Sequence, residues 1–120
     1  MQIPALLLPT FFVLMFVVQL IHSIEELATG FHKKWFFFKM SFKFFLTFEV
    51  LHNLFWFAVL IFNQFPYRSY LMAFFIVLMF AQSLWHLAWW AMKKQYVPGL
   101  VTAIIHVMLF LAFYFQYVRI

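Results

Sequence analysis

Residues 9–29 read PTFFVLMFVVQLIHSIEELAT, an apolar run in which polar side chains gather only toward the end. About 20 predominantly apolar residues suffice for one α-helix to cross the hydrocarbon core of a bilayer. The same run nevertheless contains His22, Glu25 and Glu26. A carboxylate in a hydrocarbon layer costs roughly 2.5–3.5 kcal/mol on insertion scales. The stretch therefore predicts a membrane-spanning helix whose ionisable groups have a positive partner, such as a metal ion, a proton or a basic side chain.

Three further apolar runs of similar length follow, at residues 42–65, 70–92 and 100–118. Gly30 is placed to end the first helix, Pro66 the second, and Pro98-Gly99 marks a turn before the last. Short connections force neighbouring helices to run antiparallel. The sequence therefore predicts an all-α fold, a single domain over residues 1–120 that forms an integral membrane up-down four-helix bundle.

The composition excludes an ordinary soluble domain. The chain is 68% hydrophobic and only 9% charged, with 21 phenylalanines, so lipid must be the solvent for most of its surface. It contains no cysteine, which excludes a disulfide framework and a thiolate metal site. The net charge of +5 does not indicate nucleic-acid binding, because the basic residues cluster beside apolar runs where anionic lipid headgroups are the expected partners.

The basic residues also predict an orientation. Six lysines fall in the first and third connections: Lys33, Lys34, Lys39, Lys43, Lys93 and Lys94. The opposite side carries only Arg68 and Arg119. Since lysine and arginine are enriched in cytoplasmic loops, we expect the first and third loops in the cytoplasm and both termini outside the cell membrane. The phenylalanine-rich segment 31–45 is interpreted as an anchoring loop at the membrane interface.

All three acidic residues of the chain lie close to a histidine. Glu25 and Glu26 follow His22 in the run His22-Ser23-Ile24-Glu25-Glu26, and Glu49 precedes His52 in Glu49-Val50-Leu51-His52. The second spacing has the Glu-x-x-His order of di-metal carboxylate bundles. Each pair puts an oxygen donor and a nitrogen donor about one helical turn apart, which is the arrangement a metal site needs.

The ionisable residues of the four predicted helices share one depth. Each lies roughly 9–17 Å from the lysine-bearing end of its helix at about 1.5 Å per residue. At about 100° per residue, the polar residues of each helix also share one face. Polar groups that face lipid have no partner, so we expect all four stripes to point inward. We therefore expect one common site inside the bundle.

Seven residues are the predicted metal ligands: His22, Glu25, Glu26, Glu49, His52, His86 and His106. They exceed the need of one tetrahedral ion and suit two ions, or one ion with a catalytic carboxylate. Nitrogen and oxygen donors without thiolate fit divalent transition metals such as Zn or Fe. Five polar neighbours are expected to orient the ligands by hydrogen bonds: Gln19, Ser23, Asn53, Gln82 and Thr102.

These features predict a metal-dependent membrane enzyme, a hydrolase or an oxidoreductase, that acts on a lipid-like apolar substrate with Glu26 as general base. Three alternatives stay open. Chains of Glu and His also serve as proton or metal-ion conduits in transporters. Two facing histidines are the axial ligands of b-type haem proteins, although a haem leaves the glutamates unexplained. A purely structural membrane subunit is the remaining possibility.

The run His22-Ser23-Ile24-Glu25-Glu26 near the end of a first apolar helix resembles the HXXEE family of small integral membrane proteins. His52-Asn53 and the Pro98-Gly99 turn before the last helix are similar to further features of that family. The resemblance covers most of the chain. It implies that His22, Glu25 and Glu26 form the centre of the site and that metal binding is its expected property, and it supplies no substrate.

Overall fold

The computed structural model describes residues 7–35 and 37–117, and all regular structure within these ranges is helical. The helices are α1 (Leu7–Ala28), α2 (Phe31–Lys34), α3 (Phe42–Ile61), α4 (Arg68–Lys93) and α5 (Leu100–Tyr117). In this part of the chain α1, α3 and α4 are long and apolar enough to cross a membrane, and α5 is a shorter apolar helix. The all-α prediction is confirmed. Val118 and Arg119, used above for the last span and for the orientation, lie outside the described residues.

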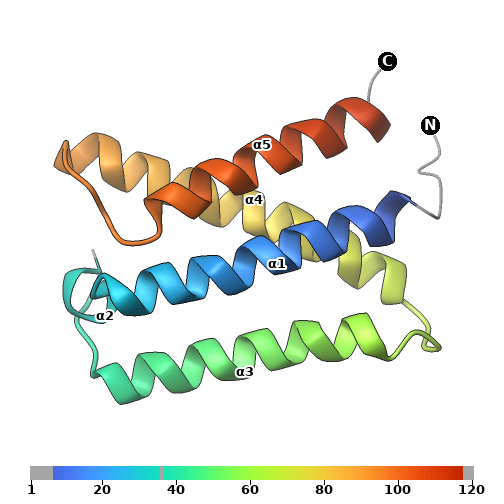
Figure 1. Cartoon of the computed structure of the whole chain (residues 1–120), viewed down its shortest axis with the longest axis horizontal. Helices are drawn as coiled ribbons and strands as arrows, with labels where there is room; N and C mark the ends of the chain where they lie inside the picture. Colours follow the sequence, from blue (N-terminus) through green and yellow to red (C-terminus); the bar gives the residue numbers. More distant parts are fainter. Residues whose placement is uncertain (1–6, 36, 118–120) are drawn as a thin grey trace.

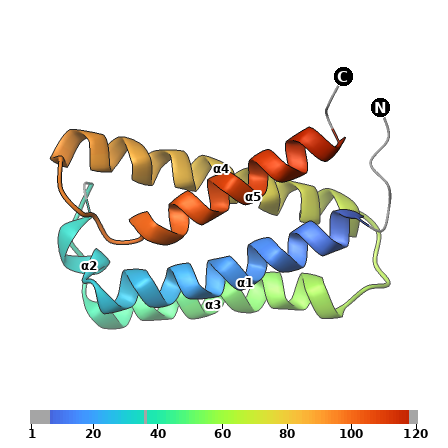
Figure 2. The same ribbon diagram turned by 45° about the horizontal axis from the view of Figure 1, so that its top comes forward.

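The four long helices lie lengthwise, and each runs back along the direction of the one before it (Figures 1 and 2). The first described turn of α1, the last of α5 and the α3–α4 connection lie at one end of the molecule. The short α2 and the α4–α5 connection lie at the other end. Helix α1 contacts the other three long helices, α4 packs most extensively on α5, and α3 packs mainly on α1. Helix α4 likewise contacts the other three long helices, so α1 and α4 together form the centre of the packing.

Two helix ends follow the local sequence. Gly30 adopts φ 82°, a left-handed conformation that suits glycine, directly after the last turn of α1. The predicted stop at Gly30 is therefore confirmed. Helix α3 begins after Ser41, whose hydroxyl accepts a hydrogen bond from the Phe44 backbone N–H at 3.1 Å. A serine in this position satisfies one of the unpaired amides at a helix start.

The far end of α3 differs from the prediction. The helix stops at Ile61, well before Pro66, which was expected to end it. Proline is excluded from a helix interior and disfavours helical backbone at the residue before it, so it does not require a stop as early as Ile61. The Arg68 side chain donates hydrogen bonds to the carbonyl oxygens of Val59 and Leu60, both at 2.9 Å. The last carbonyls of α3 thus find partners one turn early, and the chain turns toward α4.

The segment expected as an anchoring loop contains the single turn of α2. Its Phe31 is buried and stacks on Phe45 of α3, with ring centroids 4.9 Å apart. Phe31 also meets the edge of Trp89 from α4 at 5.9 Å. These aromatic contacts connect the segment to helices α3 and α4, so this part of it packs into the protein.

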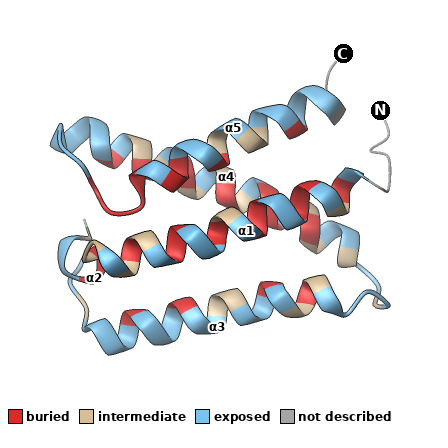
Figure 3. Ribbon diagram, in the orientation of Figure 1, coloured by how far each residue is buried: buried red, intermediate tan, exposed pale blue. Residues whose placement is uncertain are grey.

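Buried side chains form layers along the helices, and Figure 3 shows buried positions recurring along α1. One apolar cluster includes Leu8, Phe12, Met15, Trp56, Phe75, Ile76 and Met79. A second apolar cluster consists of Phe31, Phe45, Trp89, Val97 and Leu100. Between them lies a polar layer of buried residues: Gln19, His22, Ser23, Glu26, Glu49, Ser83, His86, Thr102 and His106. The expected inward direction of the polar stripes is confirmed for these residues.

Candidate metal centre

One face of α1 carries the centre of the polar layer. Met15, Gln19, His22 and Glu26 follow one another at alternating steps of four and three residues, and all are buried. This spacing keeps side chains on one side of a helix with 3.6 residues per turn. The stripe therefore changes from apolar to ionisable as it passes from the first cluster into the polar layer.

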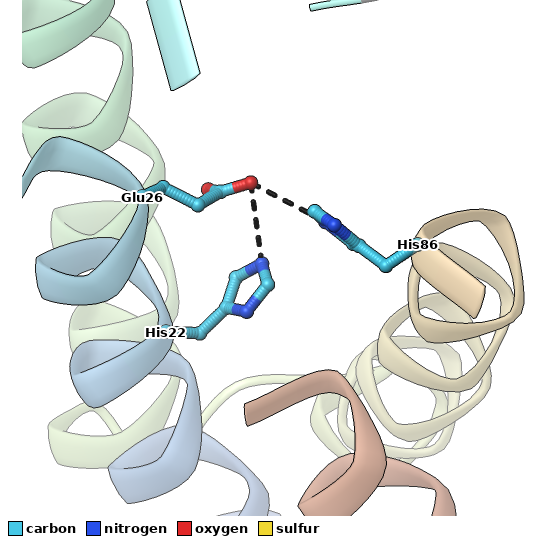
Figure 4. A group of neighbouring side chains, drawn as sticks. All are labelled: His22, Glu26 and His86. Atoms are coloured by element: carbon cyan, nitrogen blue, oxygen red, sulfur yellow. Dashed lines mark ion pairs between the residues drawn. The ribbon is translucent and has the colours of Figure 1, made fainter. Parts of the chain in front are cut away.

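Glu26 reaches between two imidazoles (Figure 4). Its Oε2 lies 3.4 Å from Nε2 of His22 and 3.3 Å from Nε2 of His86 on α4. One donor atom from each of these residues lies within 4.8 Å of the other two. His22 is 0% exposed, Glu26 4% and His86 1%. Helices α1 and α4 thus bring two nitrogen donors and one oxygen donor together, away from solvent.

The hydrogen bonds of His22 fix its tautomer. Gln82 Nε2 lies 2.7 Å from Nε2 of His22, and Thr102 Oγ1 lies 2.6 Å from Nδ1. An amide nitrogen only donates hydrogen bonds, so the Gln82 amide, oriented as it is, assigns the acceptor role to Nε2 and the donor role to Nδ1. The lone pair of Nε2 therefore lies on the side of the ring that faces Glu26.

Glu25 faces α5, away from the ligand group. Its Oε1 accepts from the Thr102 hydroxyl at 2.7 Å and from the Thr102 backbone N–H at 3.0 Å. Its Oε2 accepts from the Val101 N–H at 3.1 Å and from the Tyr96 hydroxyl. Partial burial raises the pKa of Tyr96, as does this hydrogen bond to Glu25, so the hydroxyl keeps the proton that it donates. The unpaired amides at the start of α5 explain why a residue predicted as a ligand lies here instead.

Glu49 approaches the group from α3. Its carboxylate accepts a hydrogen bond from the Ser23 hydroxyl and interacts with the Glu26 side chain. Ser23 in turn accepts from Gln19 at 3.3 Å and from Asn53 at 2.9 Å. Of the five polar neighbours expected to orient the ligands, Ser23 thus contacts Glu49, and Gln19 and Asn53 contact Ser23. Two carboxylates that share a buried site need a proton or a cation between them.

The two remaining predicted ligands have other contacts. His52 is half-buried, and its Nε2 accepts from the indole N–H of Trp56 at 3.3 Å, one turn further along α3. His106 is buried, with its ring centroid 5.8 Å from that of His22 and its Nδ1 3.2 Å from the Met15 sulfur. Its Nε2 has no hydrogen-bond partner within residues 7–35 and 37–117. The structure thus gathers three of the seven predicted ligands and leaves Glu25, Glu49, His52 and His106 around them.

Comparison with known families places these residues in a wider group. Residues 13–115 match the model of a family described as proteins of unknown function with an HXXEE motif. The chain belongs to the HXXEE family. Its motif residues are His22, Glu25 and Glu26. No curated protein and no solved structure gives a significant match. The resemblance drawn from the sequence is therefore confirmed, and the function of this HXXEE protein has to be argued from its site.

Gly99, directly before α5, packs closely against two histidines of the HXXEE site. Gly99 has φ +89°, and a Cβ atom placed on it would lie 2.7 Å from Cε1 of both His22 and His86. Real Cβ atoms essentially never approach heavy atoms so closely. The sequence predicts a turn at Pro98-Gly99 but misses this contact, as it misses the hydrogen bond from Tyr96 to Glu25. Gly99 lies close in sequence to Thr102, which was expected to orient a ligand. This closeness is the one sequence signal that could have indicated the contact of Gly99 with the histidines.

A cavity of about 380 Å³ adjoins the HXXEE centre. Glu26, Glu49, Gln82 and His86 form its polar wall. The rest of its lining is aromatic or apolar: Phe31, Trp35, Phe38, Met40, Phe44, Phe45, Phe48 and Trp85. Binding sites for small molecules share this combination of volume, apolar walls and a few converging polar groups.

Proposed function

We propose that this HXXEE protein is a membrane-embedded, metal-dependent enzyme whose four long helices form an up-down bundle across the bilayer. Three helices with the length and hydropathy of membrane spans support the bundle, as does α5, whose 18 residues extend about 27 Å at 1.5 Å per residue. His22, Glu26 and His86 would hold one divalent transition-metal ion. The substrate would be a lipid-like molecule that enters the cavity beside them.

The spacing of the donor atoms carries this proposal. Zn–N and Zn–O bonds of about 2.0–2.1 Å place two donors of a tetrahedral site about 3.3 Å apart. The Glu26 oxygen lies 3.4 Å from the His22 nitrogen and 3.3 Å from the His86 nitrogen. Charge-assisted hydrogen bonds are usually shorter, at about 2.7–2.9 Å. The two separations that involve Glu26 therefore match those around one cation, and the two imidazole nitrogens lie within 4.8 Å of each other.

The donor set suits a catalytic ion. Two histidines and one carboxylate recur in catalytic zinc sites and in non-haem iron sites, and both leave coordination positions open. An ion bound in such a site activates water at neutral pH or polarises an oxygen of the substrate. Gln82 now donates to the lone pair of His22 Nε2. An amide hydrogen and a cation cannot share this lone pair, so the Gln82 side chain would have to turn aside for His22 to hold an ion.

Glu49 is the carboxylate best placed to move a proton. It lines the cavity next to Glu26, and its hydrogen bond from Ser23 fixes the direction of its carboxylate. Glu26 was the general base expected from the sequence, but its Oε2 lies between the two imidazoles. We therefore assign the ligand role to Glu26 and the general-base role to Glu49.

The cavity walls favour a substrate with a large apolar part. Eight of the lining residues are aromatic or methionine, and they come from α2, its loop, α3 and α4. Trp35 in this wall has an indole N–H without a hydrogen-bond partner within the described ranges, and it offers a donor to a substrate oxygen. A lipid or isoprenoid with one polar functional group meets both conditions.

Within the described residues, no contact favours a conduit or a haem protein over the metal-dependent enzyme. A conduit needs polar groups across the membrane, but the half of the molecule beyond the polar layer is filled by the first apolar cluster, with Phe12, Phe75 and Met79 fully buried. A haem between His22 and His86 needs room for its macrocycle. The two rings stand nearly perpendicular with centroids 4.8 Å apart, and Glu26 lies between their nitrogens.

The proposed reaction is tested with protein reconstituted into vesicles of a total membrane lipid extract and loaded with Zn²⁺ or Fe²⁺. We expect mass spectrometry to find lipid products that depend on the metal. Glu49→Gln should remove the products and keep the bound ion. Thr47→Val on the exposed side of α3 is the matched control and should retain both. Products that form without metal, or that persist in Glu49→Gln, would contradict the proposal.

A further inference from the structure

The two adjacent glutamates of the motif point to different helices. Residues that follow one another in a helix are turned by about 100°. Glu26 therefore joins His22 and His86, while Glu25 reaches the first turn of α5. Glu25 is half-buried and Glu26 is buried. The two adjacent glutamates therefore contact different partners: Glu26 contacts the two histidines, and Glu25 contacts the start of α5.

A chain of hydrogen bonds connects Glu25 to the imidazole of His22. The Thr102 hydroxyl has one hydrogen to donate, and the Glu25 carboxylate at 2.7 Å can only accept it. The hydroxyl oxygen must then accept from Nδ1 of His22 at 2.6 Å. A second possible acceptor for the hydroxyl, the Gly99 carbonyl, is farther away at 3.4 Å. The Glu25 carboxylate thus determines the direction of the Thr102 hydroxyl hydrogen. The hydroxyl oxygen in turn requires a hydrogen on Nδ1 of His22.

We propose that Glu25 is a positioning residue, which holds His22 through Thr102 in the Nδ1–H tautomer with Nε2 directed to the ion. The inference rests on the proposed metal site and assigns a separate role to each acid of the motif. Histidine ligands commonly donate their second N–H to a carboxylate or a carbonyl, which fixes ring orientation and tautomer. Here a threonine hydroxyl lies between the imidazole and the carboxylate.

Glu25 also anchors the start of α5, so a positioning role has to be separated from a structural one. Its oxygens accept from the backbone N–H groups of Val101 and Thr102. These bonds do not involve the Thr102 side chain. Thr102→Val therefore interrupts the connection to His22 and leaves the anchoring of α5 intact. Thr102→Ser keeps the hydroxyl and is the conservative rescue variant.

The first readout is the tautomer of His22 in metal-free, detergent-purified full-length protein. Imidazole ¹⁵N chemical shifts, assigned by comparison with His22→Ala, distinguish Nδ1–H from Nε2–H. We expect the Nδ1–H form in the wild type and in Thr102→Ser, and its loss in Thr102→Val. A wild-type His22 protonated at Nε2 would overturn the inference whether or not the protein binds metal.

The second readout is Co²⁺ affinity, followed by visible absorption of the same proteins. We expect Thr102→Val and Glu25→Ala to bind about 10–100-fold more weakly than wild type, the usual effect of removing a residue that orients a ligand. Thr102→Ser and the control Thr47→Val should bind like the wild type, and Glu26→Gln should lose the site. Unchanged affinity in Thr102→Val, or loss in Glu25→Ala as complete as in Glu26→Gln, would overturn the positioning role. A wild type that takes up no Co²⁺ would instead refute the metal centre itself.

Discussion

Gly99 shows how closely one residue limits the site. Its left-handed backbone favours glycine, and the space where a side chain would begin is taken by His22 and His86. Gly30 has nearly the same backbone, with φ +82°, but the nearest atom to an added Cβ is the Lys34 Cε at 4.0 Å. The two glycines therefore separate the effect of backbone strain from that of crowding at the histidines.

Gly99→Ala is expected to abolish or strongly weaken metal binding, because the methyl group displaces both imidazoles. Gly30→Ala is the matched control, and it should lose about 1–2 kcal/mol of stability from the left-handed conformation while metal binding remains. Metal content and thermal unfolding of both purified variants measure the two effects. Equal metal binding in the two variants would contradict the described contact of Gly99 with the rings.

Part of the site could be predicted from single residues. The common depth of His22, Glu26 and His86 follows from helical rise, and their convergence follows from the cost of facing lipid. The contacts of Glu25 and His52 do not follow from the sequence, because each depends on a hydrogen-bond donor that the folded structure places beside it. The free amides of α5 attract Glu25, and the Trp56 indole occupies the lone pair of His52.

At the scale of elements, the apolar runs predict the long helices well, but the end of α3 depends on a residue of the next helix. Arg68 at the start of α4 pairs with the carbonyls of Val59 and Leu60. Asn63 and Gln64 follow shortly after and are a local sign of a helix end, which the predicted span to Phe65 does not use. A side chain that caps a neighbouring helix is a tertiary contact, and the sequence does not reveal it.

Arg68→Met is expected to destabilise the protein by about 1.5–3 kcal/mol, the usual range for hydrogen bonds that involve a charged group. Methionine approximately preserves the apolar part of the arginine side chain. The lost stability can therefore be attributed to the two hydrogen bonds with the carbonyl oxygens. Lys39→Met removes a positive charge from an exposed loop position and serves as control. Unfolding in detergent measures both variants. Equal stabilities would show that Arg68 does not hold the end of α3.

At the scale of the whole molecule, the six lysines counted in the sequence lie at one end. Helix α2, the loop before α3 and the α4–α5 connection share that end, and the α3–α4 connection lies at the other (Figure 1). The polar layer is nearer the lysine end, and the first apolar cluster fills the opposite half. Following the positive-inside rule, we propose that the candidate metal centre lies nearer the cytoplasm.

Cysteine labelling tests this orientation without background, because the chain has no cysteine. Asn63→Cys lies in the α3–α4 connection and Gln95→Cys in the α4–α5 connection, and both positions are exposed. We expect a membrane-impermeant maleimide to label Asn63→Cys on intact cells and Gln95→Cys only after lysis. The opposite pattern would reverse the orientation, and labelling of both from one side would refute the bundle of four spans.

The most direct test of the metal centre is the number of ions per chain, measured by elemental analysis of detergent-purified protein after loading and desalting. We predict one Zn or Fe per wild-type chain and none in His22→Ala, Glu26→Gln or His86→Ala. His52→Ala should retain the ion, since that imidazole lies outside the ligand group. A wild type without stoichiometric metal, or variants of His22 and His86 that keep a full ion, would contradict the assignment.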